Sequence, residues 1–274
     1  MPDKTYLTGL IGEYLEGSLS PALHNAGFAA LGVDGEYRPI DTIARNESLP
    51  TLLEKMRADG FDGFNVTHPY KTAILPLLDD IATDAKAVGA VNTVVVADDK
   101  LVGHNTDWLG FAAQFHTLET SGPALVLGAG GAGRAVVYAL QKAGVLDIRL
   151  FDPDIVAAQK LAAIDRAISV VARMEDAVRD ATCIVNASTV GMYGKGGLPL
   201  DGDLVRAKHK IADVVYFPVE TPLVLHARTL GCHVATGDIM CFEQAVAGFE
   251  IMTGLTADRT GMADSFAGLL SAAA

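Results

Sequence analysis

Positive charge is scarce in this sequence relative to negative charge. Among its 274 residues there are 21 Lys and Arg against 33 Asp and Glu, which gives a formal net charge of -12 at pH 7. An acidic chain repels phosphate backbones and anionic lipid headgroups. The composition therefore argues against nucleic acid or a membrane surface as the main partner, and leaves room for a small anion at a local basic site.

Cysteine and long apolar runs are scarce as well. The three cysteines, Cys183, Cys232 and Cys241, lack paired short spacing, so neither a disulfide framework nor a zinc site is expected. The histidines show no H-x-x-x-H or H-E-x-x-H spacing, and we predict no metal site. No apolar run is long enough to span a bilayer, and the amino terminus lacks the pattern of a signal peptide. These absences lead us to expect a cytoplasmic protein.

Hydrophobic residues are abundant and arranged in short runs. They make up 50% of the chain, and the runs alternate with amphipathic stretches, which is typical of an α/β fold with parallel strands. Ser20 is expected to cap the first helix, with Pro21 at its first position. The strands expected in the first region are 6–11, 36–40, 64–67, 92–96 and 100–103, and the helices are 21–31, 49–58 and 82–88.

A second region is expected to begin near Trp108 and to repeat the alternation. A core position at the domain junction is the expected role of Trp108 itself. Cys183 falls in an apolar run and is expected to be a buried structural thiol. The strands expected in this region are 124–127, 148–151, 170–172, 183–186 and 214–216, and the helices include 134–143, 239–252 and 261–271.

A glycine-rich turn follows the expected strand 124–127. Its glycines have the G-x-G-x-x-G spacing, a helix is expected after them, and Asp152 ends the next strand about 20 residues further on. The first glycine permits the tight bend, the second lets the backbone approach a pyrophosphate, and the third lets the helix pack against the strand. The helix amides and dipole then receive the anion. The predicted cofactor-binding residues of this turn are Gly128, Ala129, Gly130, Gly131, Ala132 and Gly133.

Asp152 bears on the choice of cofactor. A carboxylate at this position accepts both ribose hydroxyls of NAD and repels the additional phosphate of NADP, which normally needs an arginine nearby. Pro153 and Asp154 follow, so no cation adjoins Asp152 on that side. We predict NAD, with NADP less favoured. The same residues leave open the alternative that Asp152 caps the next helix.

Several polar motifs occur in order along the chain. They are S-L-S-P-A-L-H-N at 18–25, N-V-T-H-P-Y-K at 65–71, G-A-V-N-T at 89–93, G-H-N-T-D at 103–107, N-A-S-T-V-G-M at 186–192, T-P-L at 221–223 and the segment 240–244. These motifs resemble those of shikimate dehydrogenases. The resemblance runs from about Gly9 to Gly254, which makes the combination specific.

The resemblance implies two α/β domains with a cleft between them and the reversible oxidation of shikimate to 3-dehydroshikimate. Residues 1–107 with 240–274 are the predicted substrate-binding and catalytic domain, to which the last helices return. Residues 108–239 are the predicted Rossmann-type domain. Lys71 matches the catalytic lysine, and Asp107 is its predicted partner. The predicted substrate-binding residues are Ser18, Ser20, Asn65, Thr67, Asn92, Tyr216 and Gln244, and Gly237 is added to the cofactor-binding set.

The chemistry explains why such residues are needed. Oxidation of a secondary alcohol releases a hydride, which goes to the nicotinamide, and a proton, which needs a positioned base. Lys71 serves as that base if its surroundings bring its pKa toward working pH. Ser18 and Ser20, two residues apart ahead of a helix, are suited to one anion. For Tyr216 core packing is an equal alternative to substrate contact.

Two departures from the family pattern bear on substrate and pathway. The first loop, residues 12–17, differs from the usual sequence beside the predicted carboxylate site. Asp152-Pro153-Asp154 stands where biosynthetic members usually carry N-R-T, which suits NADP. Members with an acid there tend to use NAD, so quinate and aminoshikimate stay open as substrates. A non-catalytic NAD-binding redox sensor is a more distant alternative, and the chain is expected to be a monomer or homodimer.

Overall fold

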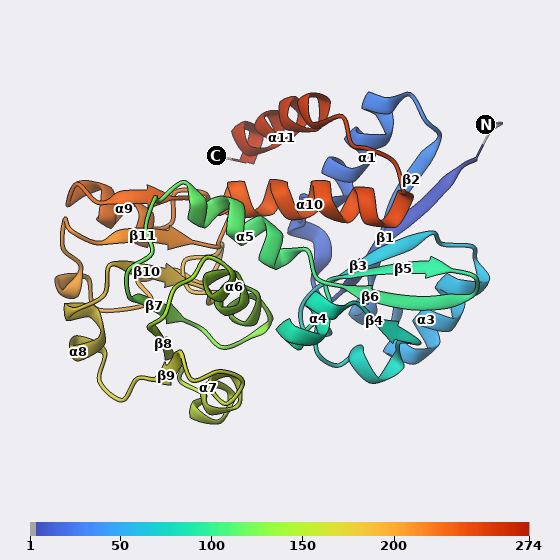
Figure 1. The fold of residues 1–274 in the computed structure, drawn as a ribbon. Coiled ribbons are helices and arrows are strands. Elements are labelled where there is room, and N and C mark those ends of the chain that lie inside the picture. The colour runs from blue at the N-terminus through green and yellow to red at the C-terminus, as the bar shows by residue number, and fades with distance from the viewer. Residues whose placement is uncertain (1–3, 274) are drawn as a thin grey trace. The chain divides into compact units, whose positions relative to one another are not determined.

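The structure, a computed structural model, describes residues 4–273. The chain divides into two compact units, each with its own six-stranded sheet (Figure 1). The first unit extends to Thr106 and resumes at Gln244, and the second runs from Asp107 to Glu243. Both units combine helices with sheets that are largely or wholly parallel, which confirms the predicted α/β class.

The sheet of the first unit mixes parallel and antiparallel strands in the order β2-β1-β3-β5-β6-β4. β1 pairs in parallel with β2 and β3, whereas β5 is antiparallel to β3 and β6. Asp98 and Asp99 join β5 to β6 with φ of 48° and 62°, the signs of a two-residue hairpin turn. The strands are β1 (Tyr6–Gly12), β2 (Gly35–Asp41), β3 (Gly63–Val66), β4 (Asp80–Ile81), β5 (Thr93–Ala97) and β6 (Lys100–His104).

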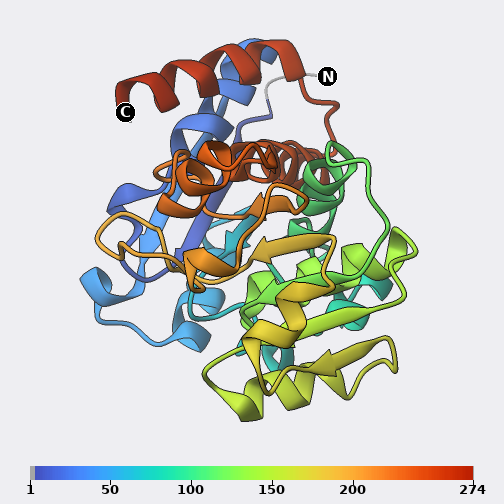
Figure 2. The same ribbon diagram turned by 90° about the vertical axis from the view of Figure 1, so that its left-hand side faces the viewer.

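Local sequence explains how the helices of this unit begin and which face they bury. α3 (Leu49–Ala58) is capped by the Ser48 hydroxyl and buries Leu49, Leu52, Leu53 and Met56, which recur at helical spacing. α11 (Arg259–Ala273) lies beside α1 (Ser20–Leu31), as Figures 1 and 2 show. The other helical segments are η1 (Leu15–Gly17), α2 (Thr42–Arg45), η2 (Leu75–Leu77), α4 (Thr83–Val88) and, from Gln244 onward, α10 (Gly237–Thr253).

The second unit is a doubly wound parallel sheet. Its strand order β12-β11-β10-β7-β8-β9 is the 3-2-1-4-5-6 order of a Rossmann fold, with the reversal between β7 and β10. The strands are β7 (Ala124–Leu127), β8 (Ile148–Phe151), β9 (Ile168–Val170), β10 (Cys183–Asn186), β11 (Lys210–Asp213) and β12 (His233–Ala235). The helical segments are α5 (Asp107–His116), α6 (Gly131–Lys142), α7 (Ile155–Ala162), α8 (Met174–Arg179), η3 (Gly202–Leu204) and α9 (Pro222–Thr229).

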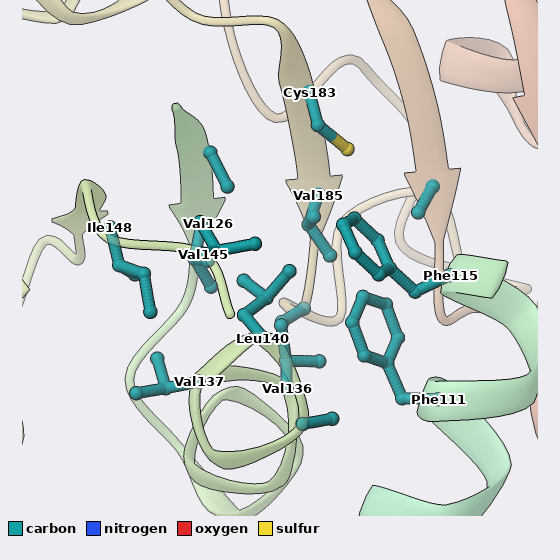
Figure 3. Close-up of a cluster of buried hydrophobic side chains, with 14 of the residues drawn as sticks. Phe111, Phe115, Val126, Val136, Val137, Leu140, Val145, Ile148, Cys183 and Val185 are labelled. Carbon is teal, nitrogen blue, oxygen red and sulfur yellow. The ribbon is translucent and has the colours of Figure 1, made fainter. Parts of the chain in front are cut away.

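The core of the second unit forms where α5 and α6 cover the central strands. Phe111 and Phe115 of α5 and Leu140 of α6 meet Val126 and Val185 of the sheet (Figure 3). Every residue of β7 and β10 is buried because helices cover both faces of a parallel sheet. The same cluster contains the side chain of Cys183, and burial raises the pKa of that thiol to about 12, so the expected structural thiol is confirmed.

Two local predictions are wrong. α1 begins at Ser20 itself, and Leu19 occupies the cap position without a side-chain cap; the hydroxyl of Ser18 instead accepts the N–H of Ser20 at 3.3 Å. The strand predicted at 214–216 ends three residues earlier, because the N–H of Val215 donates to the Asp213 carboxylate at 3.0 Å and leaves the ladder. Helix α5 and strand β12 were not predicted.

Candidate active site

A buried network of amides and hydroxyls lies where β3 ends and β5 begins. We call Asn65, Asn92, Thr93 and Thr106 the amide network. The amide nitrogen of Asn65 donates to the Thr93 hydroxyl at 2.9 Å and to the Asn92 carbonyl at 3.1 Å. Its amide oxygen accepts the hydroxyl of Tyr37 at 2.8 Å. Asn65 therefore joins β2, β3 and the loop before β5.

Asn92 ties two of the sequence motifs together. Its amide nitrogen donates to the Thr106 hydroxyl at 3.0 Å, and its amide oxygen accepts the Thr106 N–H at 2.7 Å. Asn105 also donates to the carbonyl of Ala90 at 3.0 Å. These bonds fix the segment 103–107 against the segment 89–93. Asp107, which is 5% exposed, follows directly as the first residue of α5.

The segment that carries Lys71 is joined to the same part of the unit. The carbonyl of Lys71 accepts the N–H of Val91 at 2.8 Å, and the N–H of Thr67 donates to the carbonyl of Ile11 at 3.0 Å. The residues Lys71 and Thr67 are half-buried. Backbone hydrogen bonds thus bring three predicted residues, Thr67, Lys71 and Asn92, into one region of the first unit.

Helix α10 contributes a further predicted residue to this region. A Cβ added to Gly248 would lie 3.2 Å from the amide nitrogen of Asn65, so the helix backbone runs close to the amide network. Gln244 is one turn earlier on the same face of α10. The helix thus carries Gln244 on the face that contacts the network.

Two carboxylates order the atypical first loop. The N–H of Leu15 donates to Asp41 at 2.9 Å, and this bond is the largest cause of the lowered pKa of Asp41. The hydroxyl of Tyr70, next to Lys71, donates to Glu13 at 2.9 Å. Residues Ser18 and Ser20, which follow this loop, are half-buried. The link from Glu13 to Tyr70 was missed by the sequence analysis, since 57 residues separate the two.

The glycine turn after β7 has the shape that a pyrophosphate requires. Gly128 has φ of 117°, a value that favours glycine, and a Cβ on Gly133 would lie 2.1 Å from the Gly128 carbonyl oxygen. Gly130 occupies the cap position of α6 without a side-chain cap, and a Cβ there would meet nothing within 4 Å. The first-turn N–H groups of α6 have no partner within their helix. These residues fit a dinucleotide phosphate.

Asp152 lies beside this turn and does not cap the following helix. Its carboxylate accepts the N–H of Ala129 at 2.7 Å and the N–H of Asp154 at 2.8 Å. Asp154 is the residue that caps α7, through the N–H groups of Val156 and Ala157. The helix-cap alternative for Asp152 is therefore wrong. Its carboxylate holds the end of β8 against the glycine turn.

A second polar network lies at the ends of β10 and β11. We call Asp213, Asn186 and Thr221 the carboxylate network. The Asp213 carboxylate accepts the Asn186 amide at 2.9 Å and the Thr221 hydroxyl at 2.7 Å. All three residues are fully buried, and burial raises the pKa of Asp213 to about 6. The sequence analysis missed Asp213, whose signal was an acid at the end of an apolar run.

The remaining predicted residues follow this network along the chain. Tyr216, three residues beyond Asp213, is half-buried. Gly237 is the first residue of α10, and a Cβ there would lie 2.3 Å from the Val215 carbonyl oxygen. A side chain at 237 would thus displace the segment that leads to Tyr216.

Residues 4–273 contain neither a cluster of metal-binding side chains nor a helix that could cross a membrane. Within them, no group of three or more His, Cys, Asp or Glu side chains is placed to hold a metal ion. None of the helices described is long and apolar enough to cross a bilayer.

Known proteins resemble this chain along nearly its whole length. The family model described as the shikimate dehydrogenase substrate binding domain matches residues 10–94. A quinate/shikimate dehydrogenase (NAD(+)) of Corynebacterium efficiens is 42% identical over 287 residues, which cover 98% of this chain and 100% of that protein. A shikimate dehydrogenase (NADP(+)) of Arthrobacter sp. is 40% identical, with 98% and 97% covered.

Solved structures agree with these relatives. A quinate dehydrogenase from Corynebacterium glutamicum in complex with NAD superposes with a TM-score of 0.90 at 39% identity, covering 96% of this chain and 99% of that one. A shikimate 5-dehydrogenase from Thermus thermophilus in complex with NADP(H) and shikimate has a TM-score of 0.87 at 35% identity, with the same coverage. The chain therefore belongs to the shikimate dehydrogenase family.

Proposed function

We propose that the protein reversibly oxidises the C3 hydroxyl of shikimate to 3-dehydroshikimate with a nicotinamide cofactor. Membership of the family supports a dehydrogenase that acts on a CH–OH group. The main structural support is the amide network, which joins Asn92 to Thr106, together with the bond from the Val91 N–H to the Lys71 carbonyl next to it. Two predicted residues of the first unit that are far apart in sequence, Lys71 and Asn92, thereby lie on segments joined by hydrogen bonds.

The transfer of the alcohol proton is assigned to Lys71. The nicotinamide, when bound, supplies the carbon that takes or returns the hydride. The Lys71 amine takes the alcohol proton during oxidation and returns it during reduction. Asp107 orients the substrate through a hydrogen bond to a ring hydroxyl. An arginine would not replace Lys71, because its guanidinium stays protonated.

Substrate binding is divided among the other predicted residues. Ser18 and Ser20 hold the carboxylate, with the first-turn amides of α1 assisting. Asn65 acts through the network, since both hydrogens of its amide are used by Asn92 and Thr93. The residues proposed to contact the substrate ring are Thr67, Asn92, Tyr216 and Gln244.

Each domain is assigned one task. Residues 1–107 with 240–274 bind the substrate and carry Lys71, and residues 108–239 bind the cofactor. The glycine turn receives the pyrophosphate, because Gly130 faces open space and the first turn of α6 supplies N–H groups. Gly237 would border the nicotinamide of a bound cofactor. A cytoplasmic monomer or homodimer is the proposed form of the enzyme.

NAD is the proposed cofactor. The carboxylate of Asp152 beside the glycine turn suits a ribose with two free hydroxyls and repels a phosphate. Relatives named for NAD and for NADP are both similar to this chain, so the argument depends on Asp152. The variant Asp152→Ala is expected to narrow the preference for NAD over NADP by about tenfold, roughly the effect of one charged hydrogen bond. Steady-state kinetics with both cofactors measure it, and an unchanged ratio contradicts the assignment.

Quinate is the second candidate substrate. Two observations favour it: a close relative is named for both quinate and shikimate, and a superposable structure is that of a quinate dehydrogenase. Shikimate remains the first choice because the resemblance to the family implies that two serines at 18 and 20, rather than serine and threonine, fit shikimate better than the bulkier quinate. Aminoshikimate is a third candidate substrate for the same site.

One assay separates these substrates. The purified protein is incubated with shikimate, quinate or aminoshikimate and with NAD or NADP, and formation of the reduced nicotinamide is followed by absorbance. Turnover with shikimate and NAD is expected to have the highest kcat/KM. A higher value with quinate transfers the proposal to that substrate. Tight NAD binding without any turnover would overturn the enzymatic function and favour a redox sensor.

A further inference from the structure

Asp213 is a fully buried carboxylate that the assignments above do not use. It ends β11 and accepts three hydrogen bonds, from the Asn186 amide at 2.9 Å, the Val215 N–H at 3.0 Å and the Thr221 hydroxyl at 2.7 Å. All three donors are neutral groups. A buried carboxylate bonded only to neutral donors is costly even when its oxygens are satisfied, so this arrangement calls for a reason other than core stability.

The three donors belong to different segments of the second unit. Asn186 ends β10, and its amide also donates to the carbonyl of Val190 at 3.0 Å, which shapes the loop after β10. Val215 starts the segment after β11. Thr221 caps α9 by accepting the N–H of Val224 at 3.1 Å. The Asp213 carboxylate thus fixes the loops after β10 and β11 and the start of α9.

The loops after β10 and β11 also contact each other beyond the carboxylate network. The N–H of Tyr193 donates to the carbonyl of Phe217 at 3.1 Å, and the two rings stack with centroids 5.6 Å apart. At the ends of β11 and β12, the amide of Gln114 donates to the carbonyls of Asp213 and Ala235 at 2.8 and 3.0 Å. The ends of β11 and β12 are therefore tied to α5, whose first residue is Asp107.

Position in the sheet shows which half of the cofactor these loops would face. The glycine turn follows the central strand β7, and Asp152 follows β8 on one side of it. If the pyrophosphate bound at the turn and the adenosine ribose at Asp152, the nicotinamide would extend toward the other side, where β10 and β11 end. That side carries the carboxylate network, Tyr216 and Gly237.

We propose that Asp213 is a positioning residue for the nicotinamide half of the cofactor site. This inference deepens the proposed function and rests on it. The carboxylate holds the Val215 N–H, and the Val215 carbonyl lies against Gly237, so Asp213 sets the relation between the Tyr216 segment and the start of α10.

An asparagine at 213 would have the same shape but the wrong hydrogen-bonding capacity. Two carboxylate oxygens accept all three donors, whereas an amide offers one oxygen and places an NH₂ group against a donor. The Asn186 and Val215 bonds go to one oxygen and the Thr221 bond to the other. Whichever way the amide turns, at least one bond is broken or reversed, and the loops shift while the fold persists.

The test is the variant Asp213→Asn with Asp201→Asn as matched control. Asp201 is an exposed aspartate of the same unit that caps η3. For Asp213→Asn we expect kcat to fall about 10- to 100-fold, the size of effect that a shift of reacting groups by about 1 Å produces. Binding of ADP-ribose, which lacks the nicotinamide, is expected to stay at the wild-type affinity. Asp201→Asn should match the wild type in both measurements.

Calorimetric titration with NAD and with ADP-ribose gives a readout that needs no turnover. The ratio of the two dissociation constants reports the contribution of the nicotinamide, and Asp213→Asn should bring it toward one. An unchanged ratio together with an unchanged kcat overturns the proposal. An equal loss of affinity for NAD and for ADP-ribose overturns it as well. A wild-type protein that binds NAD yet turns nothing over contradicts the proposed function instead, and the binding ratio still tests Asp213.

A second pair of variants covers the case in which Asp213→Asn does not fold. Thr221→Ser keeps the hydroxyl that donates to Asp213 and caps α9, whereas Thr221→Val removes it. We expect the serine variant to keep the wild-type kcat and the valine variant to lose it. Equal activity of the two overturns the proposal.

Discussion

The two units each bury a polar network, and the two networks differ in charge. The amide network of the first unit contains only amides and hydroxyls, which both donate and accept. The carboxylate network of the second unit has a single acceptor-only group, Asp213, on which three donors converge. A neutral network stays intact over the working pH range, whereas a network around one carboxylate depends on its ionisation.

The contrast agrees with the tasks proposed for the two units. The segment of Lys71 is proposed to need one geometry at any pH at which the lysine works, and the neutral groups of the first unit suit that need. The loops after β10 and β11 are proposed to border a cofactor that must enter and leave. A network that relies on one carboxylate offers a single point at which those loops can be loosened, and this difference can be probed by variants.

The largest expected effect comes from removing the amine to which proton transfer is assigned. Lys71→Ala should lower kcat by about 10²–10⁴-fold, the usual contribution of general acid–base catalysis. Lys71→Arg should be as inactive, because arginine does not exchange its proton. Lys86→Ala, which removes an exposed lysine paired with Asp80 in the same unit, should keep the wild-type rate. Near-normal turnover of Lys71→Ala would remove this residue from the mechanism.

The second effect comes from converting the amide network into a charged one. Asn65→Asp removes the donors to Thr93 and to the Asn92 carbonyl, and sets a carboxylate against that carbonyl. We expect a loss of about 3 kcal/mol in the free energy of unfolding at pH 7, the cost of unsatisfied buried groups and an unpaired charge. Urea denaturation measures it. Asn46→Asp, an exposed change in the same unit, is the control, and equal stability of both variants would show that the neutral character of the network is unimportant.

How much of this could be predicted depends on how local each feature is. The bounds of 49–58, 124–127, 148–151 and 183–186 were predicted correctly, because turn residues flank clear apolar runs. Helix α5 was missed because it starts within the polar motif that ends at Asp107 and contains Gly110, which obscures its helical pattern. The hydrogen bonds of Asp213 join residues up to 27 positions apart, and no local pattern encodes them. Asp152 lies between these cases: its position was predicted, but its bond to Ala129 was not.

The third effect concerns a buried titratable group beside the amide network. His24 stacks on Tyr37 at 4.2 Å, and neither ring nitrogen has a hydrogen-bond partner among the described residues. Burial lowers the pKa of His24 to about 3. His24 of the unfolded chain therefore takes up a proton near pH 6.5, whereas His24 of the folded protein stays neutral there. The stability that this difference contributes is present above that pH and is lost as pH falls.

Between pH 7 and pH 5 this histidine should remove about 2 kcal/mol from the free energy of unfolding. Urea denaturation at the two pH values compares the wild type with His24→Phe, which keeps a stacked ring. The phenylalanine variant should lose that part of the pH dependence. Replacement of the exposed His233 by Phe should leave it in place. If the free energy of unfolding changed equally with pH in the wild type and in His24→Phe, the buried ring would be protonated without cost.

The smallest effect has the opposite sign and comes from the carboxylate network. Burial raises the pKa of Asp213 to about 6, so the folded protein binds a proton in the window between the unfolded value near 4 and pH 6, where the unfolded chain does not. The contribution of Asp213 to stability therefore increases as pH falls from 7 to 5, by about 1 kcal/mol. Asp213→Asn should lack this gain when its urea unfolding is compared at the two pH values, with Asp201→Asn as the control that keeps it.

Because protonation breaks the set of three accepted bonds while stabilising the fold, the pH at which stability rises is also the pH at which the loops after β10 and β11 should loosen. A variant that retained the gain would locate the titrating group elsewhere and leave the two networks alike in their response to pH.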